Sequence, residues 1–289
     1  MPALPRPPLK LARRVGELDA EDPWGHYDRI GAVARSRIDA GLPDDWDWTG
    51  KRALDFGCGV GRMLCQYADA AERAELWGCD IDRPSVDWMR SELEPPFHPF
   101  LCTEAPDLPQ ADGFFDLVWA ISVFTHMTDR WSGWLRELHR VLADDGILMT
   151  SFLGPGMWAT IGDGAWDEDR IGMCVVRAGQ PWSIGGPTVF HSEWWLREHW
   201  GRAFDFVSIH PGTAPSDHGW AVLRKRPGPI STEELERVSE DPREVDALRH
   251  NLELLHAEDR RLRPRYLRIT RFPQLSAARW WAKRLRAKL

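Results

Sequence analysis

The stretch of residues 53–62 constrains the fold more than any other part of the sequence. A short apolar run ends around Asp55 and breaks into glycines at alternate positions, Gly57, Gly59 and Gly61. An amphipathic segment, residues 63–71, follows directly. Glycine is favoured where a backbone turns sharply or approaches a ligand, so the pattern predicts a buried strand, a ligand-binding turn and a helix. Because position 62 is arginine, the form is not the Gly-x-Gly-x-x-Gly dinucleotide fingerprint.

Composition is that of an ordinary soluble globular protein. Apolar residues make up 43% and charged residues 28% of the 289 positions. No apolar run approaches the roughly 20 residues that span a bilayer, and the proline-rich, basic N-terminus lacks the apolar segment of a secretory signal. The five cysteines form no Cys-x-x-Cys pair and are typical of reduced core residues. We therefore expect a cytoplasmic protein, and a net charge of −7 argues against a nucleic-acid partner.

Strand and helix patterns alternate along residues 53–153. The expected strands are 53–56, 75–79, 100–102, 115–123 and 147–152, and the helices between them are 63–71, 83–93 and 131–142. This order is typical of an α/β, Rossmann-like fold with a doubly wound, mostly parallel sheet. Two later runs, 204–211 and 219–225, predict an antiparallel pair at the edge of the sheet.

Other segments flank or interrupt this pattern. We expect a flexible arm over residues 1–22, a main domain over 23–227 and a helical extension over 228–289. Within the main domain, residues 154–190 are rich in Gly, Trp and acidic side chains and show no periodicity. Segments of that length without regular structure are usually lids or binding insertions, so we expect an insertion there.

The helical extension carries two candidate contact surfaces. Apolar residues at 3–4 spacing predict that the helix over 231–262 packs on a partner helix, for example in a homodimer: Val245, Leu248, Leu252, Leu255 and Leu262. After Asp259 no acidic residue occurs, whereas eleven Arg and Lys accumulate around apolar residues. Such a basic amphipathic tail suits peripheral contact with the inner face of the membrane; the alternatives are docking on the protein's own acidic body and a frayed, solvated tail.

Together these motifs resemble the class I S-adenosylmethionine-dependent methyltransferases, from about Asp55 to Phe152. The family's first motif matches residues 55–62, its fourth-strand motif matches 115–122, and its turn into the fifth strand matches 140–146. The resemblance implies S-adenosylmethionine as cofactor. The positions expected to contact it are Tyr27, Asp55, Phe56, Gly57, Gly59, Arg62, Asp80, Ile81, Glu104, Ala105 and Ala120.

The chemistry of this donor fits the residues independently. Asp55 can orient the glycine loop or accept from the donor ammonium, and Arg62 can pair with the donor carboxylate or point into solvent. Asp80 lies nineteen residues after Gly61, about where an open α/β sheet places an acid for ribose hydroxyls. The alternative for Asp80 is a helix N-cap, for which Asp82 is the better candidate. Glu104 stands where the family usually has Asp, so the adenine contact could come from the Ala105 backbone instead.

A second similarity concerns the acceptor. Residues 27–31, 122–126 and 189–195 look like bacterial methyltransferases that are often encoded beside glycosyltransferases, across nearly all of 23–227. This implies O-methylation of a sugar hydroxyl on a glycan or glycosylated small molecule, a reaction that needs a general base. The candidate bases are His126, His191 and the Asp217–His218 pair. Alternatives are O- or N-methylation of a secondary metabolite, and a non-catalytic binding or scaffold protein on the same fold.

The insertion and the segment directly after it offer two further candidate ligand sites. The tryptophans Trp158, Trp166, Trp182 and Trp194 could form a sugar platform, although core packing is the more common role of a tryptophan. The acidic residues Asp163, Asp167, Glu168 and Asp169 offer enough oxygen for Mg²⁺. An acidic loop is usually only solvated, and the histidines show no zinc spacing, so we expect no metal.

Overall fold

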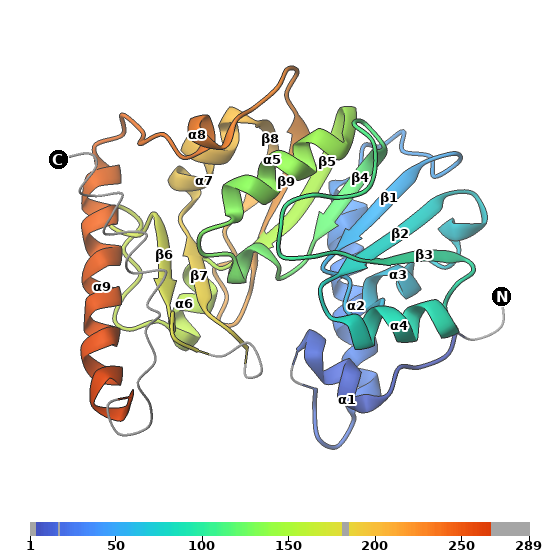
Figure 1. The fold of residues 1–289 in the computed structure, drawn as a ribbon, viewed down its shortest axis with the longest axis horizontal. Helices are drawn as coiled ribbons and strands as arrows, with labels where there is room; N and C mark the ends of the chain where they lie inside the picture. Colours follow the sequence, from blue (N-terminus) through green and yellow to red (C-terminus); the bar gives the residue numbers. More distant parts are fainter. Residues whose placement is uncertain (1–3, 17, 181–184, 267–289) are drawn as a thin grey trace. The chain divides into compact units, whose positions relative to one another are not determined.

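The computed structural model describes residues 4–16, 18–180 and 185–266 (Figure 1). The chain forms two compact units, each built from several segments. Unit 1 comprises residues 1–121, 137–150 and 222–229, and unit 2 comprises residues 122–136, 151–221 and 230–289.

A seven-stranded sheet with the order β3-β2-β1-β4-β5-β9-β8 organises the chain. Its strands are β1 (Arg52–Phe56), β2 (Glu75–Asp80), β3 (Phe97–Leu101), β4 (Phe115–Ala120), β5 (Leu142–Phe152), β8 (Phe204–His210) and β9 (Gly219–Lys225). The pairs from β3 through β5 are all parallel, with Asp55 opposite Gly78 on β2 and Trp119 on β4. The predicted Rossmann-like sheet with an antiparallel edge pair is confirmed.

Strand boundaries differ from the prediction at two places. β4 ends at Ala120 and not at Val123, because Ser122 has a left-handed backbone with φ of 58°. β5 begins at Leu142, five residues earlier than expected, and contains Asp145 at φ 62°. The turn residues expected before the strand are therefore part of it, and the register with β4 shifts between Phe115 and Leu117.

The helices of unit 1 begin where the sequence supplies caps. Helix α2 (Pro23–Gly41) starts after Asp22, whose carboxylate accepts the Gly25 amide at 2.9 Å. Helix α4 (Arg83–Glu92) starts after Asp82, which accepts the Ser85 amide at 3.1 Å, so Asp82 is confirmed as the cap. Helix α3 (Arg62–Gln66) is shorter than the predicted 63–71.

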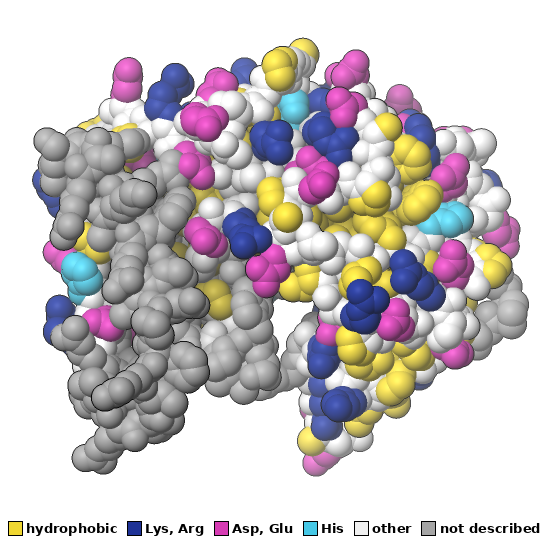
Figure 2. Space-filling model, viewed as in Figure 1, with side chains coloured by type: hydrophobic (Ala, Val, Ile, Leu, Met, Phe, Trp, Pro, Cys, Tyr) yellow, Lys and Arg dark blue, Asp and Glu magenta, His cyan; other side chains and the backbone are white. Residues whose placement is uncertain are grey.

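The N-terminal segment, which we expected to be a flexible arm, contains helical structure in its described part. Helix α1 (Leu9–Ala12) and a 3-10 turn (Arg13–Val15) form there, and Figure 2 shows Lys and Arg side chains gathered around them. Ala12 is fully buried in a cluster with Tyr27 and Val60. The physical reason is apolar burial, because Leu11 and Leu18 pack on the same cluster.

Unit 2 gives regular structure to the stretch that appeared patternless. Helix α6 (Pro155–Ile161) is followed by the antiparallel strands β6 (Met173–Val176) and β7 (Thr188–His191), and then by α7 (Glu193–His199). These elements enclose an apolar core of Leu153, Trp158, Ile171, Cys174 and Phe190. Trp158 and Trp194 are only 3% and 6% exposed, so neither forms a sugar platform. Trp182 lies outside the described residues.

The C-terminal extension packs on its own chain. After the short α8 (Thr232–Leu235), helix α9 (Arg243–Tyr266) lies along β6 in unit 2 (Figure 1). Its buried positions are Glu244, Ala247, Asn251 and Leu255, whereas Val245 is 48% exposed. The predicted apolar face was therefore wrong in part. The basic tail beyond residue 266 lies outside the described residues.

Polar side chains of α9 complete the hydrogen bonding of the small sheet. Asn251 Oδ1 accepts the Val175 amide of β6 at 2.8 Å, and Glu258 accepts the Ala178 amide at 2.9 Å. These bonds explain why a polar residue occupies the centre of the buried face. Among the described helices, none combines the length and apolarity needed to cross a membrane.

This packing predicts a measurable loss of stability on shortening Asn251. Asn251→Ala should lower the free energy of unfolding by about 1–3 kcal/mol, because the buried Val175 amide loses its acceptor. Val245→Ala is the matched control, since valine and asparagine have similar helix propensities and Val245 is exposed. Urea unfolding monitored by tryptophan fluorescence measures both. Equal stability of the two variants would show that α9 does not support β6.

Candidate functional site

The glycine loop of unit 1 is a tight turn fixed to the end of β2. Gly57, Gly59 and Gly61 have φ angles of 79°, 54° and 73°, a region that side chains with a Cβ rarely adopt. The Gly57 and Cys58 amides donate to the Cys79 carbonyl at 2.8 and 3.0 Å. The predicted strand, turn and helix start are therefore present, and the turn is shaped by backbone bonds between adjacent parallel strands.

Asp80 holds this loop from the carboxyl end of β2. Its Oδ2 accepts the Gly59 amide at 2.8 Å, and its Oδ1 accepts the Asp82 amide at 2.8 Å. Burial raises the pKa of Asp80, while the Gly59 and Ile81 amides and the Arg14 charge oppose that rise. Each carboxylate oxygen has two lone pairs, so each can accept one more hydrogen bond.

Asp55 is a buried acid at the end of β1. It is 2% exposed, and its Oδ2 has no hydrogen-bond partner among the described residues. Burial raises the pKa of Asp55 to about 8, and the Asp80 carboxylate adds to the rise, whereas the Trp119 indole and the Arg62 guanidinium oppose it. A cation placed against this carboxyl would favour its ionised form.

Arg62 provides the complementary charge at the start of α3. Its guanidinium lies over the Tyr27 ring, with 5.6 Å from Cζ to the ring centroid. The Nε and Nη1 atoms are buried without hydrogen-bond partners in the described part of the chain, and burial lowers the pKa of Arg62. Buried guanidinium groups are normally paired, so this arrangement suits an anionic ligand.

The remaining residues that we expect to contact the methyl donor are partly buried and partly exposed. Phe56 and Ala120 are buried, and the Ala120 carbonyl accepts the Thr150 hydroxyl at 3.1 Å. Ile81 is 55% exposed directly after Asp80, and Glu104 and Ala105 are exposed in the loop after β3. An exposed large apolar side chain beside an acid is typical of a surface that a ligand covers.

The three base candidates all belong to unit 2. His126 ends the 3-10 turn Phe124–His126, and its Nδ1 lies 2.7 Å from the Pro187 carbonyl oxygen. A carbonyl only accepts, so Nδ1 carries the proton and Nε2 is the basic nitrogen of the neutral ring. Burial lowers the pKa of His126, with the Pro187 bond opposing the shift, so the ring is neutral near pH 7.

The structure argues against His191 as a base. The side chain is 1% exposed at the end of β7, and neither ring nitrogen has a partner among the described residues. The Trp195 and Trp200 rings lie 5.4 and 5.9 Å from it, between centroids. Burial lowers the pKa of His191 to about 3, so it is a neutral core residue. Residue type and chain position suggested the role, but burial opposes it.

A pair of serines beside His218 was not predicted. Asp217 ends a turn in which its amide donates to the Ala214 carbonyl at 2.9 Å, and the next residue, His218, has Nδ1 3.5 Å from Ser151 Oγ. Ser151 Oγ also accepts the Ser122 amide at 2.8 Å. A polar residue with positive φ just beyond a buried strand is the feature that marks Ser122, and sequence periodicity does not detect it.

The acidic residues of the insertion do not converge. Within the described ranges, no three His, Cys, Asp or Glu side chains are grouped as metal ligands. Asp163, Asp167 and Asp169 are exposed, whereas Glu168 is half-buried and accepts hydrogen bonds from the Trp166 indole and the Glu193 amide.

Comparison with known proteins agrees with this geometry. Residues 54–150 match the methyltransferase domain family. Over 103 residues the chain is 37% identical to the methyltransferase GfsG of Streptomyces halstedii. The aligned region covers 34% of this chain and 36% of that protein. It is 32% identical over 112 residues to the malonyl-[acyl-carrier protein] O-methyltransferase of Legionella pneumophila, covering 36% of this chain and 37% of the relative. The chain thus spans little more than a third of the length of these relatives.

Solved structures extend the likeness to the fold. An S-adenosylmethionine-dependent methyltransferase from Mesorhizobium loti superposes with a TM-score of 0.52 at 18% identity, covering 68% of this chain and 99% of that one. A similar protein from Listeria monocytogenes gives a TM-score of 0.51 at 16% identity, with the same 68% of this chain and 99% of its own. At this level of identity the likeness shows the fold alone: the chain shares the fold of these S-adenosylmethionine-dependent methyltransferases.

The buried Asp55 predicts a pH-dependent stability. Its pKa is about 8 in the fold against an ordinary 3.8, so the folded state binds more protons between these values. Stability from this group is full below about pH 4 and falls as pH rises towards 8, by up to about 1.4 kcal/mol per pH unit. Asp55→Asn should remove this slope, measured as urea unfolding at pH 5 to 8.5. Identical slopes in the wild type and the variant would refute the shifted pKa.

Proposed function

We propose that this protein transfers a methyl group from S-adenosylmethionine to a sugar hydroxyl on a glycan or glycosylated small molecule. The observation that carries the donor half is that the buried atoms Arg62 Nε, Arg62 Nη1 and Asp55 Oδ2 have no hydrogen-bond partner among the described residues. The amino-acid end of the donor bears a carboxylate and an ammonium. Guanidinium donors and a carboxyl oxygen that have hydrogen bonds still to make are complementary to that end.

The other donor candidates fit the rest of the cofactor. Asp80 has a spare lone pair on each oxygen after accepting the Gly59 and Asp82 amides, which suits two ribose hydroxyls. The exposed Ile81 side chain offers an apolar surface for the adenine ring. Glu104 and Ala105, in the loop after β3, are the proposed polar contacts of that ring.

In methyl transfer the protein itself does little covalent chemistry. Bound S-adenosylmethionine would supply an electrophilic methyl group, and the chain would position the acceptor and remove its proton. His126 is the proposed base, because its Nδ1–H is held by the Pro187 carbonyl and its basic Nε2 belongs to a neutral ring. Asp217 and His218 remain a second candidate pair, with His218 close to Ser151.

The acceptor class rests on sequence similarity. Segments 27–31, 122–126 and 189–195 resemble methyltransferases encoded beside glycosyltransferases, which favours a sugar hydroxyl. The relative from Legionella pneumophila is an O-methyltransferase by name, which favours oxygen over nitrogen. The fold also occurs in the [4+2]-cyclase SpnF, at a TM-score of 0.50 and 19% identity. Because the fold alone does not determine the reaction, donor binding and methyl transfer need separate experiments.

The donor assignment is tested with Asp80→Ala. The variant should bind S-adenosylhomocysteine about 10- to 100-fold more weakly, because charge-assisted hydrogen bonds contribute about 1.5–3 kcal/mol each. Asp87→Ala is the control, since Asp87 is an exposed acid on α4. Isothermal titration calorimetry measures both. Unchanged affinity in Asp80→Ala would remove the ribose assignment, and absence of binding to the wild type would overturn the proposed function.

The base assignment is tested by comparing two histidines. His126→Ala should lower turnover by about 10²- to 10⁴-fold with unchanged S-adenosylhomocysteine affinity, the usual effect of losing a general base. His191→Leu should retain turnover and raise stability, because two unpartnered buried nitrogens are removed. Formation of S-adenosylhomocysteine with a panel of methyl glycosides reports turnover. Full activity in His126→Ala would show that His126 is not the general base. Loss of activity in a folded His191→Leu would make His191 the better candidate for the base.

A further inference from the structure

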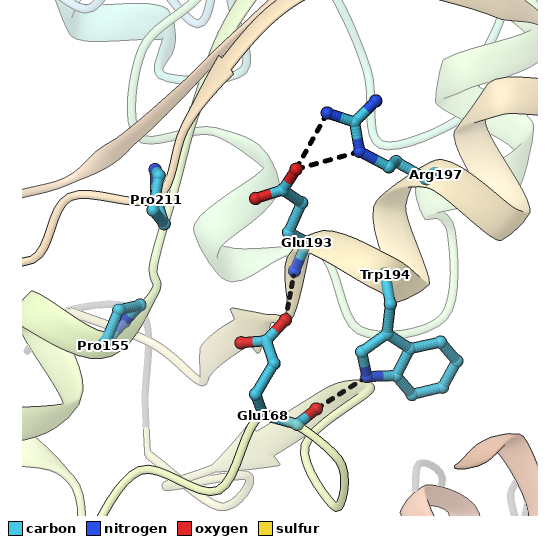
Figure 3. A pocket seen from close by; sticks show the side chains of 6 residues that line it. All are labelled: Pro155, Glu168, Glu193, Trp194, Arg197 and Pro211. Atoms are coloured by element: carbon cyan, nitrogen blue, oxygen red, sulfur yellow. Dashed lines mark hydrogen bonds and ion pairs between the residues drawn. The ribbon is translucent and has the colours of Figure 1, made fainter.

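Unit 2 contains an open cavity of about 370 Å³ that the donor and base candidates do not use. Figure 3 shows its lining residues, Pro155, Glu168, Glu193, Trp194, Arg197 and Pro211. Pro155 begins α6, three residues after the end of β5, and Pro211 directly follows β8. The volume lies within the range of small-molecule sites. In open α/β folds, ligands bind near the carboxyl ends of strands, which is where β5 ends.

Glu168 is held rigidly in this cavity. Its Oε2 accepts the Trp166 indole N–H at 2.8 Å, and its Oε1 accepts the Glu193 amide at 3.0 Å. Its main-chain carbonyl accepts the Trp194 indole N–H at 2.7 Å. Burial raises the pKa of Glu168, although these donors oppose the shift. The carboxylate is therefore oriented before any ligand arrives, and each oxygen keeps one lone pair.

Glu193 and Arg197 form the second polar element. Glu193 Oε1 accepts from Arg197 Nε at 2.9 Å and lies 2.8 Å from Nη2. Figure 3 shows the other carboxylate oxygen turned away from Arg197, towards the Pro211 side of the cavity. The Arg197 guanidinium also lies over the Phe206 ring, 5.1 Å from Cζ to the centroid. One turn of α7 thus presents an acceptor and a donor in fixed relation.

This set of groups selects a ligand class. Two carboxylates disfavour an anion, and an apolar ligand would offer no donor to their remaining lone pairs. A bare ammonium would face the Arg197 charge. Adjacent hydroxyl groups satisfy all three side chains, because each hydroxyl donates to a carboxylate and accepts from the guanidinium. The Pro155 and Pro211 rings offer apolar walls for the C–H surface of such a polyol.

We propose that this cavity binds a neutral sugar ring of the acceptor, recognised by Glu168, Glu193 and Arg197. The assignment of that ring to the acceptor rests on the proposed function, whereas the binding itself does not. Recognition here depends on hydrogen bonds and not on aromatic stacking, because the Trp194 ring is buried and its N–H is already donated to Glu168.

The proposal is tested by saturation-transfer NMR with methyl α-glucopyranoside and methyl α-mannopyranoside on the full chain. Wild-type protein should give a saturable signal, and Glu193→Gln and Arg197→Met should each weaken binding at least tenfold. Glu253→Gln, an exposed acid on α9, is the matched control and should bind as the wild type does. Glu168→Gln, which keeps the shape of the side chain, provides a third variant.

The outcomes separate this proposal from the proposed function. Calorimetry with S-adenosylhomocysteine should give the same affinity in all these variants. Absence of glycoside binding to a wild type that binds S-adenosylhomocysteine would overturn the sugar site and leave the donor assignment standing. Binding of methyl glucosaminide in preference to both neutral glycosides would identify a cation site and refute the polyol assignment. Glycoside binding that is equal in Glu193→Gln, Arg197→Met and the control would place the sugar elsewhere.

Discussion

The hydrogen bond from the Gly59 amide to the Asp80 carboxylate is the interaction on which unit 1 depends. It joins the turn after β1 to the end of β2, the neighbouring parallel strand. The Cys79 carbonyl reinforces the same junction by accepting the Gly57 and Cys58 amides. Three left-handed glycines can stay in place because both strand ends hold them. The conformation of the loop is thus fixed by hydrogen bonds within the chain.

That preformed loop has an energetic cost in the groups beneath it. Asp55 and Arg62 are buried with unsatisfied atoms, an arrangement that a chain selected only for stability would replace with apolar residues. Neighbouring strands compensate, since β1 and β4 are almost entirely buried and pair over Ala53, Leu54 and Asp55. Local violations of packing rules inside a well-packed scaffold are typical of binding sites. Asp55 and Arg62, whose buried atoms lack hydrogen bonds, flank the glycine turn of residues 57–61 directly in the sequence. We therefore treat them as parts of one candidate site.

Local signals made much of this structure predictable. The glycine turn, the alternating strands and the cap at Asp82 each depend on residues that are close in the sequence. The N-terminal segment and the α9 face depend on distant partners. Ala12 is buried because Tyr27 and Val60 are there to cover it, and Asn251 is buried because β6 presents an amide. Apolar periodicity therefore selected Val245 for a face that α9 does not bury.

The tryptophans show that dependence on distant partners also limits the prediction of function from sequence. Their number suggested aromatic platforms for sugars, yet Trp158 and Trp194 are used in the core of unit 2. Their contribution to the proposed sugar site is indirect: the Trp166 and Trp194 indoles fix the side chain and backbone of Glu168. Selection by fixed carboxylates and a guanidinium discriminates ligands by the direction of each hydroxyl. Stacking would accept any ring with an apolar face, whereas a missing or inverted hydroxyl forms one hydrogen bond fewer with Glu168, Glu193 or Arg197. A site built in this way therefore favours one sugar stereochemistry over another.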